Sequence, residues 1–227
     1  MICLVNKIPE LNLLNAELVK IKCLYDSYKE DNNVLFWCQN TDKAVISMTD
    51  GNMIIFNNGA DLEELKEFVE VLSPVCIYSD YNTLLAINRK PDERINVMHR
   101  FCDVKAGIES DKLSSDKLYN LLDTDGLSLP EYPYFAVDYC RRKNKGYADY
   151  FAIENKCAAI SFNSGKLAII NGIASREKGF GSIALNGIMA KNFSRELLVC
   201  CRDKVLGFYE KNGFELLYYS GYWVKNK

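Results

Sequence analysis

The sequence of 227 residues lacks several features that would point directly to a function. It has a single histidine, His99, in the strand-like stretch INVMHRF, and none of its nine cysteines is spaced as CxxC. Both facts argue against a bound metal such as zinc, which needs closely spaced cysteine and histidine ligands. No apolar run reaches the roughly eighteen residues that span a bilayer, and the opening MICLVNKIPELN lacks the apolar stretch of a signal peptide. We therefore expect a cytoplasmic protein with no membrane partner, whose cysteines are small buried hydrophobic residues.

Strong positive charge is missing as well. The formal net charge is −2, and the one dense basic cluster, Arg141 to Lys145, closes an expected helix, where cations suit the helix dipole. A nucleic-acid-binding protein usually presents a basic stripe, so we expect no nucleic-acid partner. The composition, 48% hydrophobic and 26% charged, is that of an ordinary globular protein with one large domain or two small ones.

The second half of the chain shows a clear order of elements. Helices are expected over 114–123 and 133–145, and strands over 147–154, 156–162 and 166–174, with a turn at 163–165. These strands predict an antiparallel meander. A helix ending near Lys191, a buried strand over 196–201, a helix over 203–212 and a final hairpin follow.

The first half repeats part of this order. A helix over about 9–29 precedes three short strands (VLFWCQ, KAVISM and NMIIFN), a helix (ADLEELKEFVEVL) and a strand (PVCIYS). Because the order from 147 to 201 is the same, we expect a structural duplication with domains 1–103 and 104–227. The predicted fold class is α/β (α+β), with a mixed, mainly antiparallel sheet flanked by helices in two tandem halves.

A glycine-containing loop joins a strand to a helix at Arg176 to Ser182, with the sequence REKGFGS. The first turn of a helix has unpaired N–H groups and the positive end of the helix dipole, so it stabilises an anion. Glycines allow close approach to those groups, and Arg176 and Lys178 add positive charge. The corresponding joint of the first half, 57–61, has one glycine, no arginine, and Asp61 where an anion would sit. We expect that half to bind no phosphate.

Two other interpretations of this loop compete. It can be a tight turn with a glycine at the start of a helix. It also fits a dinucleotide fingerprint, with Gly179, Gly181, Ala184 and the later Asp203. We reject the fingerprint because a Rossmann glycine follows its strand almost at once, and because the strands before the loop form a meander. Too little chain also remains after Asp203 for further parallel strands.

Two motifs together resemble the GNAT superfamily of acyl-CoA N-acyltransferases. The first is R-x-K-G-x-G at Arg176 to Gly181, which is similar to that family's pyrophosphate loop. The second is FYEKNGF, at 208–214, which resembles the family's late-helix signature. One helix and one strand separate the motifs, as in the family. The resemblance covers about 104–227, and over 1–100 it rests on element order only.

The resemblance implies acetyl-CoA as cofactor and names the residues that would contact it. In the family, the fourth and fifth strands splay apart, and the pantetheine arm lies in the gap and hydrogen-bonds to the backbone like an added strand. Three residues would line this arm: Asn171, Gly172 and Ile173. The pyrophosphate would lie on Arg176, Glu177, Lys178, Gly179, Phe180, Gly181 and Ser182. Phe208 and Arg202 are the other expected cofactor contacts, although the family often has asparagine at the position of Arg202.

The implied reaction is direct attack of an amine on the acetyl group in a ternary complex. Tyr209 matches the tyrosine that in many members protonates the departing thiolate, although a tyrosine at this helical spacing is usually a core residue. The general base is left open between Glu154, Asp149 and a chain of water molecules. The alternative function is a GNAT-fold module that binds acyl-CoA without turnover, and a protein that binds no CoA at all is a third.

The acceptor amine stays open between small molecules, peptides and protein lysines, and a homodimer is compatible with the sequence. Aromatic residues of 132–139 and 218–223 are candidates for the acceptor pocket, although such runs more often belong to the core.

Overall fold

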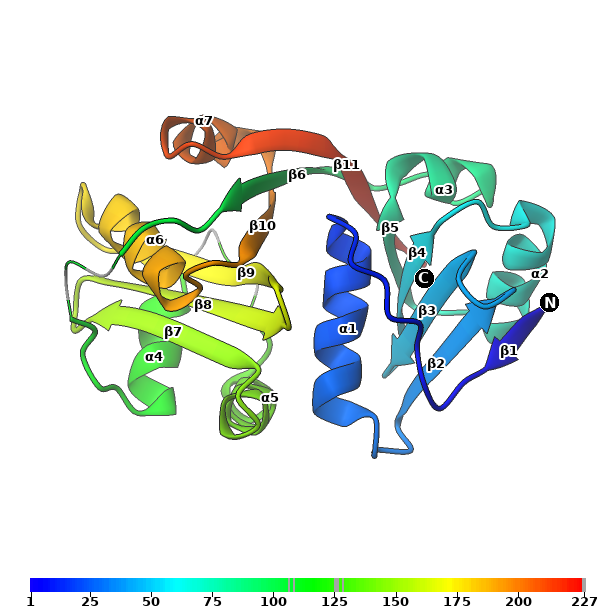
Figure 1. Cartoon of the computed structure of the whole chain (residues 1–227), viewed down its shortest axis with the longest axis horizontal. Coiled ribbons are helices and arrows are strands. Elements are labelled where there is room, and N and C mark those ends of the chain that lie inside the picture. Colours follow the sequence, from blue (N-terminus) through cyan, green and yellow to red (C-terminus); the bar gives the residue numbers. More distant parts are fainter. Residues whose placement is uncertain (106, 108, 125–126, 128, 226–227) are drawn as a thin grey trace. The chain divides into compact units, whose positions relative to one another are not determined.

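The computed structural model describes residues 1–105, 107, 109–124, 127 and 129–225 (Figure 1). The chain forms two compact units. The first consists of Met1–Met98 with Cys200–Lys227, and the second of His99–Val199. Each unit is described by itself below.

The first unit is a sheet with helices on both faces. Strands β1 to β4 form an antiparallel series, β5 pairs parallel to β4, and β11 pairs antiparallel to β5. The elements of this unit are β1 (Ile2–Leu4), α1 (Ala16–Tyr28), β2 (Val34–Gln39), β3 (Ala44–Thr49), β4 (Asn52–Asn57), α2 (Leu62–Leu72), β5 (Cys76–Asp80), α3 (Tyr81–Ala86), the first part of β6 (Glu93–Phe101), α7 (Asp203–Lys211) and β11 (Glu215–Val224).

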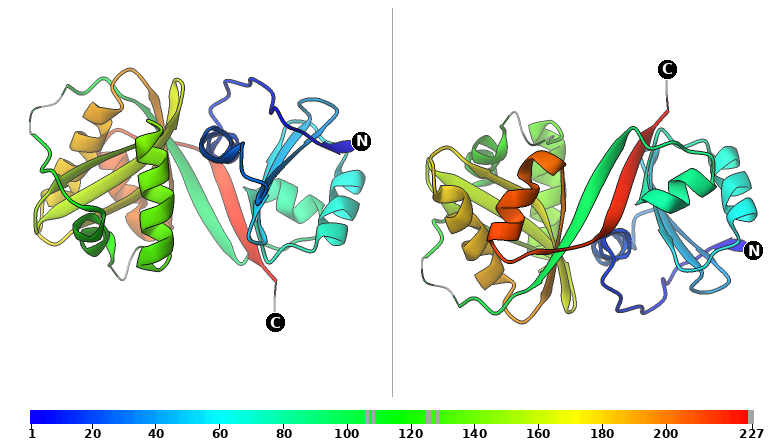
Figure 2. Two further views of the ribbon diagram at one scale, coloured as in Figure 1. Left: turned by 90° about the horizontal axis from the view of Figure 1, so that it is seen from below. Right: turned by 90° about the horizontal axis from the view of Figure 1, so that it is seen from above.

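Alternating side chains of these strands form two cores. On one face, the α1 residues Leu18 and Ile21 pack with Phe36 of β2 and other buried residues. On the other face, α2 and the residues around α3 pack with Trp37 and Ile46. Neighbouring residues of a strand point to opposite faces, so Phe36 and Trp37 belong to different cores. Figure 2 shows α1 on one side of this sheet and α2 and α3 on the other.

The second unit contains the meander and the expected helices. Strands β7 (Ala148–Ile153), β8 (Cys157–Ser164) and β9 (Leu167–Ser175) are antiparallel, and β10 (Glu196–Cys201) pairs parallel to β9. Helix α6 (Phe180–Lys191) packs on β7, β8 and β9, while α4 (Ser115–Leu122) packs on β8 and β9, and α5 (Tyr132–Asn144) on β7. The order of β2–β3–β4–α2–β5 is therefore repeated as β7–β8–β9–α6–β10, which confirms the predicted duplication and fold class.

Two predictions about individual elements are wrong, and two short elements were missed. The helix expected over 9–29 starts only at Ala16, because the Asn15 side chain caps it by accepting from the Leu18 N–H. The short elements β1 and α3 lack a clear periodic pattern and were not predicted. The expected final hairpin is instead the single strand β11.

Gly221, which lies between the two segments of the expected hairpin, has a packing role and no turn role. It lies inside β11, paired with Ser79 of β5. A Cβ atom there would lie 2.9 Å from Pro91 Cβ and 3.2 Å from the Glu93 carbonyl oxygen. Glycine is therefore needed because another segment passes close to the backbone.

The predicted boundary at 103/104 differs from the observed division. Residues after Val199 belong to the first unit because β11 pairs with β5. In the second unit, the chain just after β6 exchanges hydrogen bonds with residues before β10: Cys102 N–H donates to the Arg195 carbonyl and Ser194 N–H to the Cys102 carbonyl. The segments that follow the two repeated sets of elements, β11 and the chain at Cys102, thus each bond to the other predicted domain. The order of elements in the sequence does not reveal this exchange.

Candidate functional site

The pairing of β9 and β10 stops partway along β9. The register runs from Leu167–Glu196 to Ile170–Val199. β9 continues to Ser175 along β8, but its register shifts there, so that Asn171 is the extra residue of a β-bulge. The remaining edge of β9, including Gly172 and Ile173, has backbone groups that an extended ligand can pair with as an added strand.

The loop that follows β9 leads directly into the open N-terminus of α6. Its backbone is anchored to β8 by the Arg176 N–H, which donates to the Lys156 carbonyl at 2.8 Å. Gly179, the N-cap residue, has a φ of +89°, a left-handed conformation that favours glycine. No side chain of the described residues caps this helix, and residues 176–179 are exposed while 180–182 are partly buried. The first turn of α6 is therefore the kind of helix end that receives an anion.

The side chain of Arg176 points to α4. Its Nη2 donates to the Asn120 carbonyl oxygen at 2.6 Å, at the negative end of that helix. It also lines a cavity of about 240 Å³ together with Leu113, Lys117, Asn120, Leu121, Glu154 and Asn155. One donor of the guanidinium is thus held by α4, and the expected contact of Arg176 with a pyrophosphate stays a prediction.

A cation near the loop was missed in the sequence. The ammonium of Lys156 lies 4.7 Å from the ring centre of Phe180, the first residue of α6. Lys156 precedes Cys157, which pairs with Ser175 at the end of β9. The meander predicted a strand beginning at 156, but only the exact register places this lysine beside the loop.

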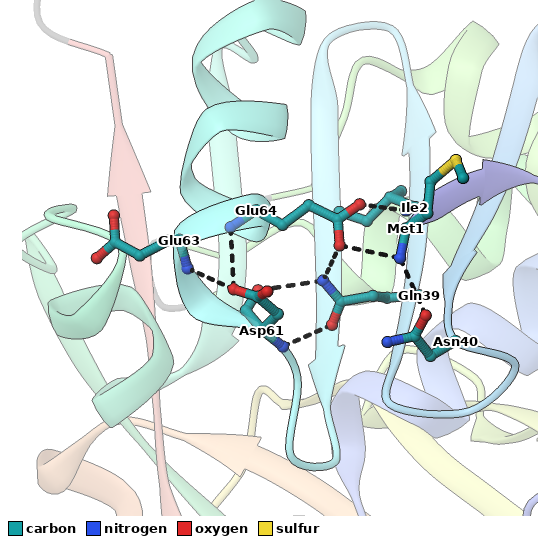
Figure 3. Close-up of polar contacts among 7 residues, drawn as sticks. All are labelled: Met1, Ile2, Gln39, Asn40, Asp61, Glu63 and Glu64. Atoms are coloured by element: carbon teal, nitrogen blue, oxygen red, sulfur yellow. Dashed lines mark hydrogen bonds and ion pairs between the residues drawn. The ribbon is translucent and has the colours of Figure 1, made fainter.

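The equivalent helix of the first unit is closed by its own chain. The Asp61 carboxylate caps α2 by accepting from the N–H groups of Glu63 and Glu64, both at 3.2 Å (Figure 3). The buried Gln39 holds the same turn, because its side chain accepts from Asp61 N–H at 2.7 Å and donates to Glu64 at 2.8 Å. A fixed carboxylate thus occupies the place where an anion would bind, which gives the predicted lack of phosphate binding a structural reason.

This cap gives a stability prediction. Asp61→Ala leaves two N–H groups without their acceptor and is expected to lower the free energy of unfolding by about 1 kcal/mol. Asp61→Asn should cost much less, because asparagine caps helices about as well. Urea unfolding of both variants checks this, and equal losses for alanine and asparagine would contradict the capping role.

The other predicted residues lie in the first unit. Arg202 forms a two-point ion pair with Glu93, in which Nε donates to Oε1 and Nη2 to Oε2 at 3.1 Å. Its guanidinium can contact a cofactor only if it also keeps its bonds to Glu93 or if this ion pair breaks. Phe208 and Tyr209 of α7 are in ring contact at 5.1 Å.

Tyr209 has the surroundings of a core residue. It is 4% exposed, and its ring also contacts Phe214 at 5.5 Å. Burial raises the pKa of Tyr209 above its ordinary value, and the neighbouring Cys201 and Cys200 add to the rise. Its hydroxyl therefore stays protonated at neutral pH and can act as a proton donor.

The carboxylates considered as general bases have partners. Asp149 accepts from Asn163 Nδ2 at 3.1 Å and lies 3.5 Å from Arg195 Nη1, while burial raises its pKa. Glu154 forms an ion pair with Lys117 at 2.6 Å. Neither arrangement identifies a base.

No group of three or more histidine, cysteine, aspartate or glutamate side chains among the described residues is placed to hold a metal ion. None of the described helices has the length and apolar character that a membrane span requires.

Comparisons with known proteins relate the chain to solved structures only. No family model matches the sequence, and no curated protein is detectably similar to it. A GCN5-related N-acetyltransferase from Kribbella flavida superimposes with a TM-score of 0.58 at 10% identity, covering 82% of this chain and 87% of that one. A GCN5-related N-acetyltransferase from Sphaerobacter thermophilus gives 0.50 at 11% identity, covering 96% of both chains. At such identities the likeness concerns the fold.

Proposed function

Because the chain has the GNAT fold, we propose that it is an N-acetyltransferase that moves an acetyl group from acetyl-CoA to an amine. The observation that carries this proposal is the N-terminus of α6, which no side chain of the described residues caps and which follows a strand whose pairing with β10 ends at Ile170. Helix N–H groups suit a diphosphate and a free strand edge suits the amide groups of a pantetheine arm, so the two features fit two parts of one cofactor.

The residues present fit this cofactor. The bound acetyl-CoA would supply an activated acetyl thioester. The N–H groups of Gly181 and Ser182 in the first turn of α6, with the charges of Lys178 and Lys156, would hold the diphosphate. The β9 edge at Gly172 and Ile173 would orient the pantetheine arm, and a backbone N–H near Ile173 would stabilise the oxyanion of a tetrahedral intermediate.

Tyr209 is proposed to give its proton to the departing thiolate. Tyr209→Phe keeps the ring and its packing against Phe208 and Phe214 while removing the proton. We expect kcat for acetylation to fall at least about tenfold, with the Kd for CoA nearly unchanged. Steady-state rates and calorimetric titration measure the two quantities, and an unchanged kcat would exclude Tyr209 as the acid.

The proposal is tested by titrating the protein with CoA in a calorimeter and by following CoA release from acetyl-CoA with a panel of amines. CoA should be measured by chromatography, because thiol reagents would also react with the nine cysteines of the protein. Binding with amine-dependent release supports the enzyme, and the absence of binding overturns it.

The second candidate function is a module that binds acyl-CoA without turnover. It is favoured by the engaged carboxylates of Asp149 and Glu154, because a general base must be free to accept a proton. CoA binding without release by any amine would favour this function.

A further inference from the structure

A cluster of polar and ionisable side chains lies inside the first unit, where α1 meets β5, β11 and the end of β10. At its back, the Glu17 carboxylate is 1% exposed and accepts hydrogen bonds from Tyr218 Oη at 2.5 Å and from Ser220 Oγ. The Ala16 N–H donates to the same Tyr218 oxygen at 2.7 Å. These bonds fix the start of α1 to β11.

The front of the cluster is an ammonium group held by aromatic rings. Lys20 Nζ lies 3.7 Å from the ring centre of Tyr78 and donates to Tyr222 Oη at 3.3 Å. The two tyrosine rings are in contact at 4.7 Å, and the Tyr78 hydroxyl lies 3.0 Å from Cys200 Sγ. Lys20, Tyr222 and Cys200 are each partly exposed, whereas Tyr78 is buried. The arrangement is therefore a group of donors held by a buried ring, in which three of the residues are in part open to solvent.

The ammonium of Lys20 can donate a further hydrogen bond. It has three N–H donors, of which one is bound to Tyr222 and one side faces the Tyr78 ring. Within the described part of the chain Lys20 makes no ion pair, and Glu17 acts on it only through space. Burial alone would lower its pKa, but Cys200, Tyr222 and Glu17 together raise it above the ordinary value. The group is charged at neutral pH and can bind one further acceptor.

The cluster also lies in the same unit as the proposed acid. Cys200, whose sulfur contacts the Tyr78 hydroxyl, is followed in β10 by Cys201, and both cysteines add to the raised pKa of Tyr209. A single cation with phenol hydroxyls and flat rings suits one carboxylate on a small organic body, whereas a phosphate is better matched by several cations.

We propose that Lys20, with Tyr222 and Tyr78, binds the carboxylate of the acetyl acceptor, which is therefore an amine that also carries a carboxylate, as an amino acid does. This inference rests on the proposed acetyltransferase function. It assigns acceptor recognition to the unit whose own phosphate-loop equivalent is closed by Asp61.

The test uses matched pairs of amines with and without a carboxylate: lysine and cadaverine, arginine and agmatine, histidine and histamine, tyrosine and tyramine. For each we would measure kcat/KM with acetyl-CoA, and calorimetric binding of the amine alone. At least one carboxylated member should be preferred over its partner by about tenfold or more. Lys20→Met should remove most of that preference, and Lys20→Arg should keep part of it.

Lys29→Met is the control, because Lys29 lies at the end of the same helix near the ring of Tyr25, outside the cluster. It should leave the preference unchanged. If Lys20→Met does not fold, Tyr222→Phe tests the same contact by removing only the hydroxyl that accepts from Lys20. Circular dichroism and denaturant midpoints verify folding of each variant.

The outcomes separate this inference from the proposed function. No binding or acetylation of any carboxylated amine, equal use of both members of every pair, or an undiminished preference in the folded Lys20→Met or Tyr222→Phe variant would overturn it. Amino-acid binding that depends on Lys20 in a protein that does not bind CoA would retain the carboxylate site and reject the acetyltransferase. A carboxylate that binds at Lys20 but is never acetylated while other amines are would make it a regulatory ligand and overturn the acceptor assignment.

Discussion

Replacement of both Gly179 and Gly181 by aspartate is expected to reduce the affinity for CoA by roughly a hundredfold or more, which is about 2.7 kcal/mol. Two carboxylates at the start of α6 would repel the diphosphate and would themselves accept from the N–H groups proposed to hold it. Among the described residues, a Cβ atom at Gly179 would meet no atom within 4 Å outside its chain neighbours, so aspartate at this position would not clash within the protein. Calorimetric titration with CoA measures it.

Aspartate at Gly165 is the matched control. Gly165 lies in the turn between β8 and β9 and has a φ of +60°, and an added Cβ there would also meet none of the described atoms within 4 Å. Gly165→Asp carries a similar backbone strain and the same charge as aspartate at Gly179, away from α6. CoA affinity should be retained in this variant. Equal affinities of the wild type and the double-aspartate protein, with both folded, would remove the basis of the proposed function.

The first unit already contains the arrangement that this double variant would create. Asp61 caps α2 through the N–H groups of Glu63 and Glu64, whereas α6 begins after Gly179 with no side-chain cap from the part of the chain that the structure describes. Two helices that follow strands in repeated positions thus differ mainly in what occupies their first turn. The difference follows from single residues and was visible in the sequence, because aspartate competes with an external anion for the same donors.

Local patterns were sufficient for most elements of the second unit. The strand ELLVCC matches β10 residue for residue, and the turn at Asn163 to Gly165 falls at the β8–β9 junction. The loop 176–182 lies between β9 and α6 as predicted. Such features depend on neighbours in the sequence: a continuous apolar run, a turn dipeptide, or a glycine that precedes a helix.

Features that depend on distant pairing could not be predicted. Arg202 was assigned to the cofactor by its distance from Tyr209, yet its guanidinium meets Glu93, 109 residues earlier. Two other features also depend on residues that are far apart in the sequence. They are the pairing of β11 with β5, and the contacts of Lys20 with Tyr222 and of Cys200 with Tyr78. A lysine in a helix looks solvent-exposed in the sequence, and only the pairing of distant strands shows what it faces.

Helix α6, which carries the proposed phosphate site, depends on a glycine that no motif singles out. A Cβ atom at Gly187 would lie 2.2 Å from the ring of Phe151, a fully buried residue of β7. Gly187→Ala is therefore expected to lower the free energy of unfolding by about 3 kcal/mol, near the upper end for overpacked cores, despite the better helix propensity of alanine. Urea unfolding measures the loss.

Gly207→Ala and a double variant separate packing from propensity. Gly207 lies inside α7, where an added Cβ would meet nothing within 4 Å, so alanine should stabilise the protein there by roughly 0.5–1 kcal/mol. Phe151→Ala alone should cost about 3–5 kcal/mol, because it leaves a cavity. The methyl group that Gly187→Ala introduces would fill part of that cavity, so the double variant Phe151→Ala with Gly187→Ala should lose at least about 1 kcal/mol less than the sum of the single losses. Strict additivity, or a Gly187→Ala protein as stable as the wild type, would show that α6 does not rest on Phe151 and that its position over the sheet has another cause.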